Sequence, residues 1–172
     1  MEVIIIRKAG PGDLKTLKDI SRKTFSEAFS ANNSDENMKS YLQEAFSSEK
    51  LSSELTNKGS EFYFAVLNHE VIGYLKLNTG QSQTEIHDDK ALEIERIYVL
   101  QQYHGKKVGQ LLYEKAIDVA RQKGVNYVWL GVWEENPRAI NFYKKNGFVE
   151  FDKHIFYLGD DEQTDIMMKK LL

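Results

Sequence analysis

The feature that most constrains this chain is the stretch of residues 92–123, whose pattern is typical of a strand, a turn and a helix. Apolar residues alternate with polar ones at the start of the stretch, which predicts a strand over residues 92–99. The alternation breaks where Glu95 and Arg96 stand side by side. An extra residue at that point predicts a β-bulge.

The turn that follows the predicted strand has the composition of an anion site. Residues 104–109 read His-Gly-Lys-Lys-Val-Gly and lead into a predicted helix over residues 108–123. The first amides of a helix lack partners within the helix, the helix dipole adds positive charge, and glycine lets a ligand approach the backbone. We interpret the turn as a cradle for phosphate or diphosphate. A plain connection with two incidental glycines is the alternative.

Two common phosphate-binding motifs do not fit this turn. A P-loop needs Gly-Lys-Ser/Thr at the start of the helix, and the chain contains no such tripeptide. A Rossmann site needs G-x-G-x-x-G after an early strand, and the glycine spacing here is different.

Composition narrows the classes of function. The chain has 172 residues, a net charge of −3 and no cysteine. This length predicts one domain over residues 1–172. The negative charge argues against nucleic acid as a partner, and no apolar run reaches the roughly 18–20 residues of a membrane span. The lack of cysteine is typical of a cytoplasmic protein, and the isolated histidines predict no metal site.

The remaining elements follow from periodicity and turn signals. We predict a mixed α/β fold, with helices on both faces of the sheet and a right-handed crossover between two parallel strands. The polar segment 78–90 is predicted to be an exposed, mobile loop. In chain order the other elements are a strand at 3–8, two or three helices within 14–56, a hairpin over 62–77, a strand at 127–132, a helix between Asn136 and Gly147, and strands at 148–158 and 164–172.

A second motif carries a resemblance to a known family. Asn-x-x-Ala-Ile-x-Phe-Tyr-x-Lys-x-Gly-Phe over residues 136–148 resembles a signature of the GNAT N-acetyltransferases. The turn is similar to that family's acyl-CoA motif, Gln/Arg-Gly-x-Gly-x-Gly/Ala, although His104 replaces Gln/Arg and Lys107 replaces the middle glycine. Segments such as NNSDENMKSYLQEAF and FYLGDDEQTD resemble the PaiA-type bacterial spermidine/spermine N-acetyltransferases.

The resemblance implies a fold, an activity and a co-substrate. The implied fold is a mixed, largely antiparallel sheet of about seven strands with a central parallel pair. The implied activity is acetyl transfer from acetyl-CoA to a primary amine, with a polyamine such as spermidine or spermine as the expected small-molecule substrate. The residues implied in coenzyme A binding are the main chain of Ile97, Tyr98 and Val99 for the pantetheine arm, the turn from His104 through Gly105, Lys106, Lys107, Val108 and Gly109 to Gln110 for the diphosphate, Asn136 for pantetheine or as a helix cap, and Lys145 for a phosphate.

Three side chains are predicted to move protons. The resemblance places Tyr143 near the thioester sulfur, where a phenol is a candidate general acid. Glu93 or Glu95 is expected to accept the amine proton through water; a regular strand would place both on one face, and a bulge would separate them. A main-chain amide of the bulged strand, such as that of Tyr98, is expected to polarise the carbonyl. The alternatives are a core tyrosine at 143 and a solvated or Arg96-paired role for the glutamates.

Two other functions are left open by the departures in the turn and by the unknown acceptor. One is a coenzyme A sensor that binds without turnover, and the other is a protein N-acetyltransferase. The acidic residues 160–162 are either an attractant for a cationic substrate or a solvated turn. The oligomeric state, a homodimer included, is also left open.

Overall fold

The computed structural model describes residues 2–172 and joins seven strands in one sheet, in the order β1-β2-β3-β4-β5-β7-β6. Neighbouring strands are antiparallel except β4 and β5, which are parallel. The predicted mixed sheet with a central parallel pair is therefore confirmed. The strands are β1 Ile5–Lys8, β2 Ser60–Leu67, β3 Glu70–Thr79, β4 Ala91–Val99, β5 Tyr127–Trp133, β6 Val149–Leu158 and β7 Asp161–Leu171.

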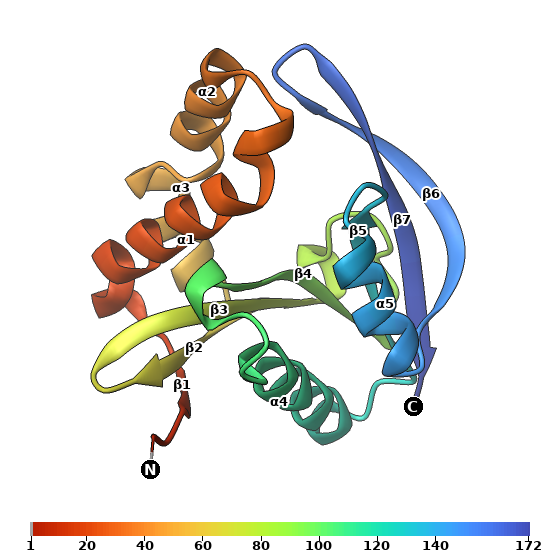
Figure 1. The fold of residues 1–172 in the computed structure, drawn as a ribbon. Helices are drawn as coiled ribbons and strands as arrows, with labels where there is room; N and C mark the ends of the chain where they lie inside the picture. Colours follow the sequence, from red (N-terminus) through yellow and green to blue (C-terminus); the bar gives the residue numbers. More distant parts are fainter. Residues whose placement is uncertain (1) are drawn as a thin grey trace.

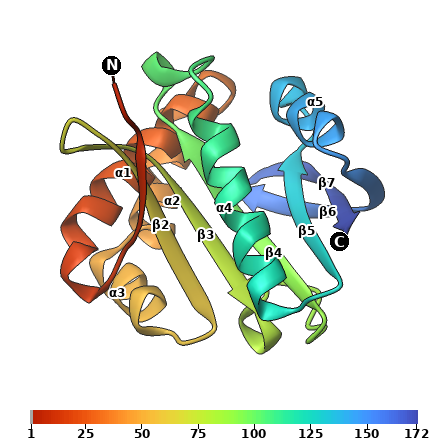
Figure 2. The ribbon, with the colours of Figure 1, turned by 90° about the horizontal axis from the view of Figure 1, so that it is seen from below.

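Five α-helices cover the two faces of the sheet. The first three lie on one face, and the last two lie on the other (Figures 1 and 2). Their starts follow local signals: Ser34 and Ser47 cap the second and third helices, and Asn136 with Pro137 begins the fifth. Among residues 2–172, no helix has the length and apolar character needed to cross a bilayer. The helices are α1 Leu14–Phe29, α2 Asp35–Ala45, α3 Ser48–Thr56, α4 Val108–Lys123 and α5 Pro137–Lys145.

The centre of the sheet forks between β4 and β5. The two strands pair only from Ala91–Ile94 to Tyr127–Leu130, and they then diverge, with β4 passing behind α4 and β5 running toward α5 (Figure 2). In the β3–β4 ladder Lys76 pairs with Arg96 and Leu77 pairs with Ile94, so Glu95 is the extra residue of a bulge. The predicted bulge is confirmed, and it lies where the fork begins.

The prediction of an exposed loop over residues 78–90 holds for most of the segment and is wrong at two residues. Asn78 is fully buried at the end of β3, and Gln83 is buried against the core. Both are polar residues that find buried partners far away in the sequence, which a rule assigning polar segments to the surface cannot foresee. Two strand boundaries also differ, since β1 begins at Ile5 and β7 begins at Asp161.

Candidate functional site

The turn before α4 leaves most of its main-chain amides without partners among residues 2–172, although the Lys106 amide donates to the Tyr103 carbonyl at 3.4 Å. The first main-chain hydrogen bond of α4 runs from the Leu111 amide to the Lys107 carbonyl, at 3.2 Å. Within residues 2–172, no acceptor meets the amides of Gly105 or of residues 107–110. The start of a 16-residue helix therefore presents a set of free donors, as an anion site requires.

The two unusual positions of the turn have different explanations. Lys107 adopts the left-handed conformation, with φ +65° and ψ 16°, at a cost of about 1 kcal/mol for a side chain. Gly109 needs no such conformation, and a Cβ added there would meet its nearest neighbour, the Val99 side chain, only at 4.0 Å. Because no neighbour in the described part of the chain requires glycine at 109, the missing side chain fits the close approach of a ligand.

Beyond its last pair with β5, the main-chain groups of β4 point alternately toward β3 and into the gap between β4 and β5. The Leu100 amide donates to the Ile72 carbonyl of β3 at 2.9 Å, so alternation directs Tyr98 to β3 and directs Ile97 and Val99 into the gap. The Tyr98 amide therefore does not point into the gap, in contrast to the expectation that it polarises a bound carbonyl.

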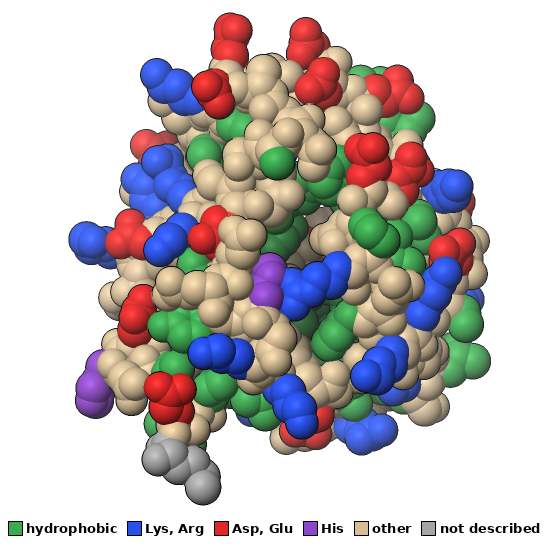
Figure 3. All heavy atoms as spheres, viewed as in Figure 1, with side chains coloured by type: hydrophobic (Ala, Val, Ile, Leu, Met, Phe, Trp, Pro, Cys, Tyr) green, Lys and Arg blue, Asp and Glu red, His purple; other side chains and the backbone are tan. Residues whose placement is uncertain are grey.

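His104 spans the gap from the turn to α5. Its Nε2 lies 2.8 Å from the Val99 carbonyl, and its Nδ1 contacts the guanidinium of Arg138. Since arginine only donates hydrogen bonds, Nδ1 is the acceptor and Nε2 carries the proton. Figure 3 shows this face of the molecule hollowed at its centre, with Lys and Arg side chains gathered below and beside the hollow.

Tyr143 is buried in the wall that α5 contributes. Its side chain is 6% exposed and packs against the rings of Phe142 and Phe148. Within residues 2–172 its hydroxyl makes no hydrogen bond, and burial raises its pKa above the ordinary value. A neutral, protonated phenol with an unused donor is therefore held on the α5 side.

The other residues predicted to bind coenzyme A cap a helix, pair with a neighbouring side chain or lie exposed on the surface. Asn136 caps α5 by accepting from the Ala139 amide at 3.2 Å. The side chain of Gln110 forms hydrogen bonds with the side chain of Asn146, so only the main-chain amide of Gln110 is free. Lys106, Lys107 and Lys145 are exposed.

On the opposite face of the fork, Glu95 belongs to a buried charged network. Its carboxylate lies 2.8 Å from the Lys76 ammonium and 3.0 Å from the Arg96 guanidinium, and both cations also meet Glu54 of α3. Burial alone would raise the pKa of Glu95, but Arg96 and Lys76 lower it to about 2. The carboxylate is therefore a very weak base.

Among residues 2–172, Glu93 forms no ion pair with a cation. It is 3% exposed and accepts three hydrogen bonds, from the Thr84 amide at 2.8 Å, the Thr84 hydroxyl at 2.6 Å and the Asn78 amide group at 3.0 Å. Burial raises its pKa above the ordinary value. Glu93 is thus a better proton acceptor than Glu95 near neutral pH.

The expectation that a bulge would separate Glu93 from Glu95 was wrong. The Nδ2 of Asn78 donates to both carboxylates, at 3.0 and 2.8 Å, so the two lie side by side. The bulge gives Arg96 the ladder position opposite Lys76 and turns Glu95 to the same face. Sequence reasoning missed Asn78, Lys76, Glu54 and Thr84, because they come from separate segments and form no local motif.

Acidic side chains gather above the hollow. Figure 3 shows Asp and Glu side chains over α2 and the β6–β7 turn. Asp160 and Asp161 of that turn accept from the Asn37 side chain of α2, at 3.0 and 3.3 Å. Nearby on β7, burial raises the pKa of Asp165 to about 6. The hollow therefore has an acidic rim opposite a basic one.

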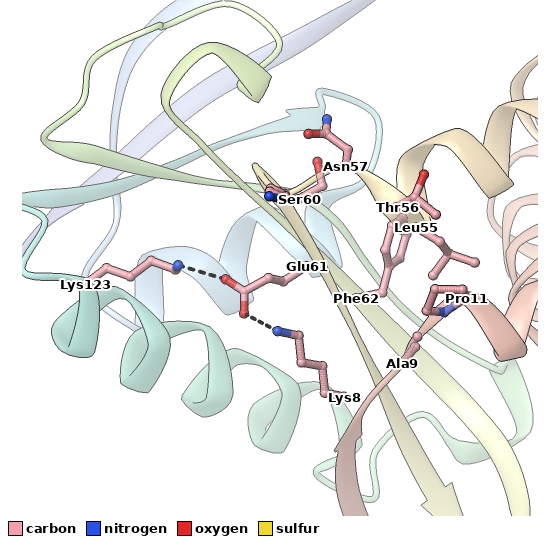
Figure 4. Close-up of a pocket in the computed structure, with 12 residues that line it drawn as sticks. Lys8, Ala9, Pro11, Leu55, Thr56, Asn57, Ser60, Glu61, Phe62 and Lys123 are labelled. Atoms are coloured by element: carbon pink, nitrogen blue, oxygen red, sulfur yellow. Dashed lines mark ion pairs between the residues drawn. The ribbon is translucent and has the colours of Figure 1, made fainter.

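A separate cavity of about 630 Å³ lies at the far end of α4. Lys8 and Lys123 both pair with Glu61 there, as Figure 4 shows. Lys123 is the last residue of α4, about 22 Å along the helix from the glycine turn at 1.5 Å per residue. This cavity is therefore not part of the candidate site. In the described part of the chain, no three acidic or histidine side chains gather to hold a metal ion.

Comparisons with known proteins agree with this geometry. Residues 15–148 match the Acetyltransferase (GNAT) family. An uncharacterized N-acetyltransferase of Lactobacillus delbrueckii subsp. lactis is 42% identical over 93% of this chain and 92% of its own length. A spermidine N(1)-acetyltransferase of Thermoplasma acidophilum is 30% identical over 97% of this chain and 96% of its own. The crystal structure of PaiA N-acetyltransferase from Thermoplasma acidophilum with coenzyme A superposes with a TM-score of 0.81, at 28% identity and 99% coverage of both chains.

Proposed function

Because this chain belongs to the GNAT family of N-acetyltransferases, we propose that it transfers acetyl from acetyl-CoA to a primary amine of a polyamine such as spermidine. Acetyl transfer from acetyl-CoA is the activity of the family. The polyamine is supported by the relative named as a spermidine acetyltransferase and by the acidic rim of the hollow. A cationic acceptor would be attracted to this rim.

The observation that carries the proposal is the set of free amides in the turn before α4. The amides of Gly105 and of residues 107–110 would hold the diphosphate of coenzyme A, and Lys106, Lys107 and Lys145 would add positive charge. Acetyl-CoA, when bound, supplies an acyl group already activated as a thioester. The turn fits this ligand because it offers unpaired donors and room at Gly109.

Main-chain groups in the fork would hold the pantetheine arm. Ile97 and Val99 present the groups that face the gap, and the arm would pair with them as an added strand does. The His104 side chain is hydrogen-bonded to the Val99 carbonyl, and it would have to release this carbonyl before the arm could bind there. The Ile97 amide would then take the carbonyl-polarising role expected of Tyr98. Asn136 would keep its capping role.

Two side chains would handle protons. The Tyr143 hydroxyl would donate to the leaving sulfur, because it is protonated, buried and free of other hydrogen bonds. Glu93 would accept the proton of the amine through water, since it lies one residue before the last paired rung of the fork. Glu95 would not act as the base, because its pKa of about 2 makes it a poor proton acceptor. Its ion pairs would instead hold the side chains of Lys76 and Arg96 in place.

The direct test is release of free thiol from acetyl-CoA with a panel of acceptors. Spermidine, a diamine, a monoamine and a lysine peptide should be compared at equal concentration, with calorimetry of coenzyme A as the binding control. Preference for spermidine is the expected result. Tight coenzyme A binding with no thiol release would favour a sensor, and preference for the peptide would favour protein acetylation. A homodimer and a cytoplasmic location stay predictions of the sequence.

A further inference from the structure

The segment between β3 and β4 is held against the sheet at one buried side chain. Gln83 accepts from the Trp129 indole at 2.7 Å and donates to the carbonyls of Gly80 and Asp88 at 3.2 and 3.0 Å. Trp129 is the residue of β5 paired with Glu93 of β4. This anchor places the next residue, Thr84, directly over the Glu93 carboxylate.

Thr84 holds both oxygens of that carboxylate. Its amide donates to Oε1 at 2.8 Å, and its hydroxyl donates to Oε2 at 2.6 Å. Thr84 is itself exposed, whereas Glu93 is buried. Asn78 gives the third bond, and the Ser60 hydroxyl fixes the Asn78 amide by donating to its Oδ1 at 2.8 Å. Three donors from two elements therefore determine where the carboxylate points.

We propose that Thr84 is a positioning residue for acetyl transfer, which holds the Glu93 carboxylate oriented and ready to accept the proton of the amine. The inference rests on the proposed role of Glu93 in the reaction. Thr84 acts on the reaction only through Glu93, and its hydroxyl is the one contact of the three that a side-chain substitution at an exposed position can remove.

The charges around Glu93 decide the direction of the expected effect. On β4 the neighbouring charge is Glu95, which is neutralised by Lys76 and Arg96, the two cations that it shares with Glu54. On β5 it faces the uncharged Trp129, and Glu85 of the loop lies by His154 of β6, at 3.4 Å. Burial raises the pKa of Glu93, and the donors from Thr84 and Asn78 oppose that rise. Loss of the Thr84 hydroxyl should therefore raise this pKa further.

The test is the pH profile of kcat/KM for Thr84→Val and Thr84→Ser. Valine keeps the shape and the amide but loses the hydroxyl, and its acidic limb should move to higher pH by about one unit, a roughly tenfold loss on that limb. Serine keeps the hydroxyl, and its profile should superimpose on that of the wild type. Thr84→Ser should melt with the wild type, whereas Thr84→Val should stay folded but melt somewhat earlier near neutral pH, because the ionised Glu93 carboxylate has lost one hydrogen bond.

Glu93→Gln separates this inference from the function on which it rests. If Glu93→Gln loses turnover while Thr84→Val keeps the wild-type profile, the inference is overturned and the proposed base survives. If Glu93→Gln turns over as fast as the wild type, the proposed base and the inference are both overturned. A shifted limb in Thr84→Val that serine restores supports both.

Discussion

Two polar regions flank the fork between β4 and β5, and they differ in how their hydrogen-bonding groups are used. The turn before α4 has free amides, and Tyr143 across the gap has a free hydroxyl. On the other face, Glu93 and Glu95 are surrounded by donors and cations. Proteins rarely leave such groups unpaired without a reason. The free groups therefore point to a ligand, and the paired groups point to a fixed geometry.

The strongest test of this difference is Tyr143→Phe. If the free hydroxyl serves the reaction, its removal should lower kcat roughly 10²–10⁴-fold. The melting temperature should not fall, because no hydrogen bond within the protein is lost. Thiol release gives kcat, and calorimetry should give an unchanged coenzyme A affinity. A variant as fast as the wild type would remove Tyr143 from the proposed chemistry.

Glu95→Gln tests the paired region. It leaves Lys76 and Arg96 with Glu54 alone, and breaking a buried ion pair costs about 3 kcal/mol or more of unfolding free energy. Urea unfolding at neutral pH measures the loss. Glu93→Gln is the matched control, because burial raises the pKa of Glu93 and its ionised form already costs stability. This variant should unfold no earlier than the wild type.

Glu95 also predicts how the unfolding free energy responds to acid. The pKa of Glu95 lies at about 2 in the folded chain, below the ordinary 4.5. Its contribution to stability is therefore complete above about pH 4.5 and is lost as the pH falls toward 2. Unfolding free energy measured across this range should drop in the wild type and drop less in Glu95→Gln. Equal slopes would mean that the ion pairs of Glu95 do not stabilise the fold.

Gly109→Asp sharpens the reading of the turn, because its two expected effects have opposite signs. A carboxylate in the first helical turn should stabilise α4 by about 0.5 kcal/mol through the helix dipole. The same charge should repel a diphosphate and weaken coenzyme A binding by about 2 kcal/mol, roughly 30-fold. Gly109→Asn is the neutral control of equal size. Equal binding by the Asp and Asn variants would contradict a diphosphate at this turn.

The smallest expected effects belong to the exposed lysines. Lys107→Gln or Lys145→Gln should each weaken coenzyme A binding by about 0.5–1 kcal/mol, as exposed charge pairs do. This loss should vanish at high salt, because the charges are screened. Lys39→Gln, on α2, is an exposed control that should leave the affinity unchanged. Titrations in low and high salt would show whether either lysine lies near a phosphate.

Much of the frame could be predicted from sequence. The bulge at Glu95, the crossover through α4 and the ends of α4 and α5 were all predicted, and the structure confirms them. Each depends on neighbouring residues: side-chain alternation, a glycine in the left-handed region at Gly124, or an Asn-Pro pair at a helix start. These are local rules of main-chain sterics and hydrogen bonding, so a short stretch of sequence is enough.

Only the tertiary structure decided how the two glutamates differ. Glu93 and Glu95 are separated by one residue, and nothing in that stretch distinguishes a base from an ion-paired carboxylate. Lys76 from β3 and Glu54 from α3 form the ion-paired network around Glu95, whereas Thr84 from the following loop holds Glu93. The pKa of a carboxyl group depends on burial and on the charges within a few ångströms. Those neighbours come from distant parts of the chain, so the sequence supplied both candidates and the fold chose between them.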